Sequence, residues 1–305
     1  HSDHSDHSDN VKHDNETNES NKIEDIKNLV ELLEQRNDKL EELKVQIANL
    51  ATNIIGEPER NIKKFRELLS LFDITSDDPE YKVVFLSLQK LVAFSALAIF
   101  KDILPNYKIK EKITEEEDEA VLKGKSFKLK KETKQLRDYE RSLITLYKLY
   151  LNRLERMVHC INKGKSNKSN FYHSVHPKEA KVRIAKIGTK CLCELLISHP
   201  NFNHSDILID AIVVLMANNH HKEIADLCIA TVIRVYKEDK LGQVSLEIVK
   251  STAKLIKARN YNVNPDVLRT FLALKIKEVK VKDGQSKKDM KKIRSKLNMM
   301  SKREK

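Results

Sequence analysis

The chain has 305 residues, with only 6 Gly and 6 Pro, 40 % hydrophobic residues and 33 % charged residues. So few turn residues leave long uninterrupted segments, and this composition is typical of helices that bury one stripe and expose the rest. The formal net charge is +12, but residues 1–25 carry eight acidic against two basic side chains, and residues 280–305 carry eleven basic against three acidic. A polyanionic partner or two solvated tails would each account for this distribution.

The first segment, residues 1–21, is acidic and of low complexity, and it opens with three His-Ser-Asp triplets. It lacks the apolar side chains needed to build a core, so we expect it to be disordered. The triplets are more typical of a repeat expansion than of a metal site.

A heptad pattern follows over residues 23–54. One position of the repeat holds Ile26, Leu33, Leu40, Ile47 and Ile54, the other holds Leu29, Leu43 and Leu50, and Arg36 interrupts it. Four heptads fit a coiled-coil seam or a long helix docked along the domain. Docking is favoured because a second apolar helix, over residues 61–72, follows a stop at Gly56 and Pro58.

A third helix is predicted over residues 78–104. Asp78 and Pro79 supply an N-cap and a first-turn proline. The helix is apolar on nearly every face, so we expect it at the centre of a helical layer, with Leu88 and Phe94 buried. Gln89 and Lys90 near its middle argue against a membrane span.

Residues 108–127 change from acidic to basic without an apolar period and are the expected linker. The helix predicted next, over 129–161, has an apolar line made of Leu136, Leu143, Tyr147, Leu151, Leu154 and Val158. Its tyrosines, Tyr139, Tyr147 and Tyr150, are expected to pack against neighbours in preference to stacking on bases.

After a basic loop at 162–170, the pattern predicts shorter helices over 177–198, 205–217, 222–237, 241–259 and 265–276. Starts at Lys178 and His221 lie 43 residues apart, which suggests stacked helical hairpins in an armadillo-like or HEAT-like solenoid. The expected fold is therefore all-α. Its expected parts are the tail 1–21, an N-terminal helical region 22–107, the linker 108–127, a helical-repeat-like domain 128–279 and a basic tail 280–305.

Two basic clusters are the candidate nucleic-acid-binding residues. The first comprises Lys128, Lys130, Lys131, Lys134 and Arg137, and the second comprises Lys287, Lys288, Lys291, Lys292, Arg294 and Lys296. The first is either a phosphate-binding stripe or a solvated face that balances the acidic run before it. The second alternates with apolar residues at helical spacing, which fits a helix that folds on RNA or in a protein groove, or a nuclear import signal.

No pattern indicates catalysis, a cofactor or a metal. The sequence has no glycine-rich loop, and Asp102 and Asp138 lack partners for acid–base chemistry. The spacing of His159, Cys160, His173 and His176 does not suit zinc. The four cysteines (Cys160, Cys191, Cys193 and Cys228) are expected to be reduced and largely buried, with Cys191 and Cys193 on different faces of one helix.

Two groups of segments resemble the nucleolar complex protein 3 family, in sequence and in order, over roughly residues 45–280. The first group is EPERNIKKFRELL at 57–69, FKDILPNYKIK at 100–110 and KETKQLRDYERSLITLYKLYLNRLE at 131–155. The second is CLCELLISHPNFN at 191–203, KEDKLGQVSLEIVK at 237–250 and KARNYNVNPDVLRTFLALKIKEV at 257–279.

This resemblance implies an all-helical nuclear and nucleolar protein that pairs with nucleolar complex protein 2. Such a heterodimer accompanies precursors of the large ribosomal subunit, with their pre-ribosomal RNA, through maturation and export. The family continues past the basic tail into a further helical domain, so this chain is expected to be a fragment. A non-enzymatic assembly factor, without a small-molecule substrate or membrane attachment, is therefore expected. The alternatives are a chromatin-bound factor in replication licensing, which acts with replication-initiation factors, and a cytoplasmic transport adaptor.

Overall fold

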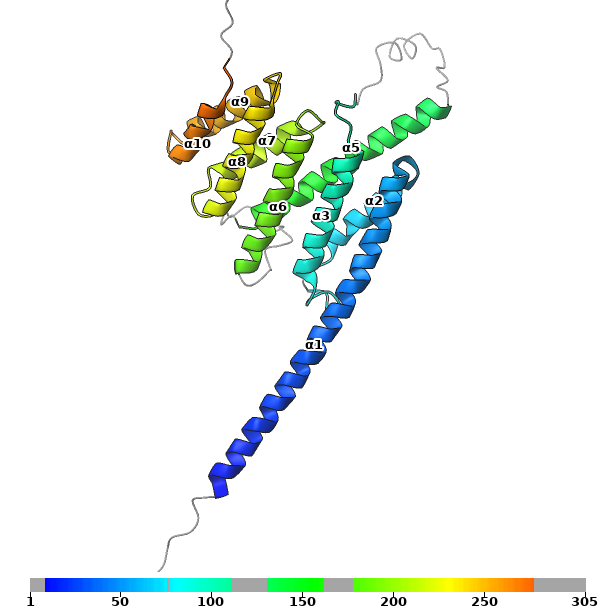
Figure 1. Ribbon diagram of the computed structural model, residues 1–305, viewed down its shortest axis with the longest axis vertical. Coiled ribbons are helices and arrows are strands. Elements are labelled where there is room, and N and C mark those ends of the chain that lie inside the picture. The colour runs from blue at the N-terminus through cyan, green and yellow to red at the C-terminus, as the bar shows by residue number, and fades with distance from the viewer. Residues whose placement is uncertain (1–8, 76, 111–130, 162–177, 277–305) are drawn as a thin grey trace, which may run out of the picture.

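A computed structural model describes residues 9–75, 77–110, 131–161 and 178–276 (Figure 1). Within these ranges the chain forms helices and no strand, which confirms the all-α prediction. The elements are α1 (Asp9–Gly56), α2 (Pro58–Ser70), η1 (Leu71–Asp73), α3 (Phe85–Ile103), α5 (Lys131–His159), α6 (Lys178–Ser198), α7 (Ser205–Met216), α8 (Lys222–Glu238), α9 (Gln243–Ala258), α10 (Pro265–Arg269) and η2 (Thr270–Ala273).

The helices pack in two layers. In one layer α1 contacts α3, α3 contacts α6, α6 contacts α8, and α8 contacts η2. In the other, α2 contacts α5, α5 contacts α7, and α7 contacts α9. Successive helices alternate between the layers, so the long helix α5 passes behind α3 and α6 in Figure 1. This arrangement is compatible with stacked hairpins, while the armadillo-like or HEAT-like assignment stays a prediction.

The first helix is longer than predicted. It runs for 48 residues from Asp9, so the disorder expected over 1–21 is wrong from residue 9 onward. Residues 9–21 hold no Gly or Pro, and nothing in them stops a helix that the heptads have already nucleated. Its end at Gly56 agrees with the predicted stop.

The third helix begins later than predicted. Asp78 accepts a hydrogen bond from the Glu80 backbone N–H (3.1 Å), but the residues that follow form turns, and α3 begins only at Phe85. Two adjacent β-branched residues, Val83 and Val84, lower the helix propensity at this point. Once formed, α3 contacts α1, α2, α5 and α6, which confirms its central position.

The packed region extends into the expected linker. Ile109 is buried, its N–H donates to Asn203 Oδ1 (2.9 Å), and its carbonyl accepts from Asn203 Nδ2 (2.9 Å). Residues 108–110 are therefore held against the turn between α6 and α7, and the predicted linker start at 108 is wrong by three residues. The remainder, 111–127, lies outside the described residues, as do the basic loop 162–170 and the tail 280–305.

An aromatic cluster joins α2, α3 and α5 at the centre of the core. The Phe100 ring lies 4.5 Å from Phe65, 5.3 Å from Tyr147 and 5.1 Å from Tyr150, measured between centroids. Tyr150 also donates from its hydroxyl to the carbonyl of Ala93 on α3 (2.7 Å). The tyrosines Tyr147 and Tyr150 are fully buried, so they pack as predicted and their faces cannot stack on bases.

The apolar line of α5 is confirmed with one exception. Leu143, Tyr147, Leu151, Leu154 and Val158 are buried, but Leu136 is 47 % exposed. The first turns of α5 extend past the helices that cover the rest of it (Figure 1). The exposed Leu136 follows from this position.

The helices from α6 to α9 agree with the predicted bounds to within two residues. Their ends carry strong local signals. Asp239 accepts hydrogen bonds from the backbone N–H groups of Gly242 and Ser245 (2.8 Å each), which caps α9, and Gly242 itself has φ of 74°. The last predicted helix is shorter than expected, because α10 ends at Arg269 and passes into η2.

Among the helices described, none combines the length and apolar character needed to cross a membrane. Residues 83–100 instead fall largely within α3, where Gln89 is buried with its amide near the carbonyls of Phe72 and Ile74 (3.4 and 3.5 Å).

Candidate functional site

The first part of α5 presents a basic face to solvent. The predicted residues Lys131 and Lys134 are exposed, and Arg137 is half-buried. Two further exposed cations, Arg141 and Lys148, follow Lys134 at intervals of seven residues. Residues seven apart lie nearly on one line along a helix, and Arg137 lies beside that line at three and four residues' distance.

This basic face, defined as Lys131, Lys134, Arg137, Arg141 and Lys148, extends over about 26 Å of helix at 1.5 Å per residue. Within the described ranges, no ion pair includes any of four cations of this face: Lys131, Lys134, Arg141 and Lys148. These cations therefore remain available to bind an external anion.

The sequence interpretation missed two residues of the basic face, Arg141 and Lys148. The signal was present in the seven-residue intervals from Lys134 to Arg141 and from Arg141 to Lys148, but the same segment also carries the apolar line on which its prediction as a buried helix depended. The other candidates, Lys128, Lys130 and the six basic residues of the tail, lie outside the described residues.

A second surface lies on α1. Leu43, Ile47, Leu50 and Ile54 are buried against α2 and α3, as the docking interpretation predicts. Earlier residues of the same stripe are uncovered, where α1 extends away from the other helices in Figure 1. We call this uncovered part the α1 stripe, and it comprises Ile26, Leu29, Val30, Leu32 and Leu33, which are 46–60 % exposed.

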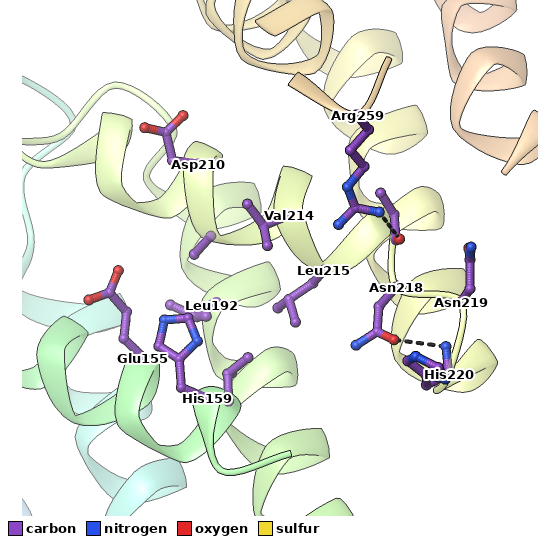
Figure 2. A pocket seen from close by; sticks show the side chains of 13 residues that line it. Glu155, His159, Leu192, Asp210, Val214, Leu215, Asn218, Asn219, His220 and Arg259 are labelled. Carbon is purple, nitrogen blue, oxygen red and sulfur yellow. Dashed lines mark hydrogen bonds between the residues drawn. The ribbon is translucent and has the colours of Figure 1, made fainter. Parts of the chain in front are cut away.

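A cavity of about 500 Å³ lies between the end of α5, α6, α7 and the end of α9 (Figure 2). Its polar side chains include Glu155, His159, Asp210 and Arg259. Arg259 donates to the carbonyl of Ala217, and Asp210 accepts from Ser251 (2.6 Å).

Figure 2 also shows Asn218 accepting from the backbone N–H of His220 (2.9 Å). Much of the polar lining is thus engaged in hydrogen bonds with other parts of the protein. The thirteen lining residues include no Ser, Thr or Cys.

The four cysteines are free and buried, as predicted. Cys191 points toward α3, with its sulfur 3.9 Å from the Ala93 carbonyl, and interaction with Cys228 of α8 lowers the pKa of Cys193. Burial raises the pKa of Cys160 and of Cys191 to about 12 each, which keeps these thiols protonated. Their role is packing.

Comparison with known proteins places this sequence in a family. Residues 42–150 match the family profile described as nucleolar complex-associated protein. Nucleolar complex protein 3 homologs from Cricetulus griseus and Homo sapiens are each 43 % identical over 247 residues, which is 81 % of this chain. The chain belongs to the nucleolar complex protein 3 family. The nucleolar complex-associated protein 3 of Schizosaccharomyces pombe is 29 % identical over 249 residues, again 81 % of this chain.

The chain spans about 29 % of the length of each of these three family members. The nucleolar complex protein 3 profile covers the docked half of α1, all of α2 and α3, and α5 up to Tyr150. The basic face therefore lies within the matched part of the chain, whereas the α1 stripe precedes that part.

Proposed function

We propose that this chain is part of a non-enzymatic assembly factor for the large ribosomal subunit that acts in the nucleolus. In this proposal it works as a heterodimer with nucleolar complex protein 2 on pre-ribosomal particles and supports their maturation and export. Membership of the nucleolar complex protein 3 family supports the location and the membership of a complex. The observation that carries the proposal is the basic face of α5.

The basic face suits attachment to RNA phosphates. Its cations extend from a helix that the core holds in place through Tyr147, Tyr150 and Leu151, so their spacing is fixed before binding. Lysine and arginine contacts of this kind position a protein on a nucleic acid without reading its sequence. We therefore expect recognition of pre-ribosomal RNA by charge and shape, with sequence selection coming from other parts of the particle.

Reversing the charge of the basic face should weaken RNA binding and its dependence on salt. The variant is the triple change Lys134→Glu, Arg141→Glu and Lys148→Glu, which leaves the buried side of α5 intact. If each cation contacts one phosphate, the slope of log K against log salt should become shallower by about 2 to 3. Fluorescence anisotropy with a fragment of pre-ribosomal RNA at several salt concentrations measures it.

A matched control carries the same change in charge elsewhere. Lys240→Glu, Lys254→Glu and Lys257→Glu alter three exposed lysines at or near α9. We expect the control to keep most of the salt slope, because long-range charge affects it less than lost phosphate contacts. Equal losses in both triples would show that only net charge matters, and would remove the basic face as the attachment site.

A further inference from the structure

The α1 stripe has the pattern of a helix that inserts into an apolar groove. Ile26, Leu29, Val30 and Leu33 stand at positions i, i+3, i+4 and i+7, and Leu32 widens the apolar face on the other side. A two-stranded coiled coil needs only the narrow seam of two positions per heptad, so this wider face fits a surface made by two helices.

The docked half of α1 shows what such a surface looks like. Its residues Leu43, Ile47, Leu50 and Ile54 lie against both α2 and α3 and are almost fully buried. The α1 stripe continues the same side of the same helix. Nothing within the described ranges of this chain covers it, because contacts with the start of α3 end near Arg36, whose Nη2 lies 3.4 Å from Ser87 Oγ.

The charge around the α1 stripe distinguishes between possible occupants. From residue 24 to residue 38 there are five acidic side chains (Glu24, Asp25, Glu31, Glu34 and Asp38) and two basic ones (Lys27 and Arg36). A second copy of the chain would bring an equally acidic helix alongside, and like charges oppose that pairing. A groove with basic residues at its rims is complementary instead.

We infer that the α1 stripe is the docking surface for a different protein, one that offers a two-helix apolar groove with basic rims. The inference rests on the proposed function, in which the partner is a second polypeptide of the complex, and it assigns that contact to one surface. Three features support it: the stripe continues an interface already formed within the chain, its width matches a groove, and its charge disfavours self-association.

The test uses purified nucleolar complex protein 2 as the probe and isothermal titration calorimetry with the full chain. The variant Leu29→Glu/Leu33→Glu places two charges in the stripe and should weaken binding at least 30-fold or so, as expected when hot-spot anchors are lost. Its thermal unfolding should match the unmodified chain, since these side chains are exposed in the absence of a partner.

The control is Lys27→Glu, which changes the net charge by the same amount at an exposed position outside the stripe. It should bind as tightly as the unmodified chain, or more tightly to a basic rim. Equal affinity of the Leu29→Glu/Leu33→Glu variant would overturn the inference and leave the proposed partnership standing.

Two further outcomes also decide the question. If the unmodified chain does not bind the probe, the proposed partnership fails, and the inference fails with it. If analytical ultracentrifugation shows a dimer of the chain that the stripe variant abolishes, the occupant is a second copy and the inference is wrong.

Discussion

Replacing Gly188 with leucine is expected to lower the free energy of unfolding by about 3 kcal/mol, by overpacking the crossing of α5 and α6. A Cβ atom at Gly188 would lie 3.0 Å from Met157 Cβ and 3.1 Å from the Leu154 carbonyl oxygen. Both contacts are tighter than a side chain normally makes, and the second is with backbone, which cannot rotate away. Alanine at this position should also destabilise, although it gains about 1 kcal/mol in helix propensity.

Gly56 provides the control for this prediction. A Cβ atom there would have no neighbour within 4 Å, so Gly56→Ala should be neutral or slightly stabilising. Urea denaturation followed by circular dichroism measures all three variants. If Gly188→Ala stabilised the chain as Gly56→Ala does, the two helices would not approach each other as closely as described.

Removing the ring at the centre of the aromatic cluster is expected to have a similar effect. Phe100→Ala should cost about 3–5 kcal/mol, because it leaves a cavity where α2, α3 and α5 meet. The ring is fully buried and contacts Phe65, Tyr147 and Tyr150. Such a loss is a large share of the 5–15 kcal/mol or so that stabilises a typical domain. Thermal and urea unfolding both report it.

The same substitution at Phe94 is the comparison. We predicted that Phe94 is buried with Leu88, but only Leu88 is; Phe94 is half-exposed, with Lys190 Nζ 5.7 Å from its ring centroid. Phe94→Ala should therefore cost less than Phe100→Ala, although both lie on α3. Similar losses at the two positions would contradict the cluster's role as the junction of three helices.

Local signals explain which helix ends could be predicted from the sequence. The starts of α9 and α10 depend on caps and turn residues such as Asp239, Gly242 and Pro265, which act within a few residues. The start of α3 could not be predicted in this way, because Asp78 and Pro79 form a good first turn that the following residues do not continue. The start of α1 was missed because an acidic composition was taken for disorder.

Tertiary information was needed for the functional surfaces. The heptads predicted an apolar side along α1, but they could not show where it is covered. Among the described residues, the heptad positions from Leu40 onward pack against other helices, whereas Ile26, Leu29 and Leu33 are exposed. Similarly, Tyr139, Tyr147 and Tyr150 are equivalent in sequence, yet Tyr139 is half-buried and the other two are enclosed. Of the basic residues, Lys131, Lys134 and Arg137 were candidates from the sequence as members of a basic cluster, and the exposure of Arg141 and Lys148 completed the basic face.

Sedimentation of the tagged chain from nuclear extracts tests the proposed role most directly. We predict that the chain sediments with precursors of the large ribosomal subunit, that RNase releases it, and that DNase does not. The triple variant of the basic face should shift toward the top of the gradient. Release by DNase alone, as a chromatin-bound replication factor would show, or sedimentation apart from these precursors, would contradict an assembly factor held on pre-ribosomal RNA.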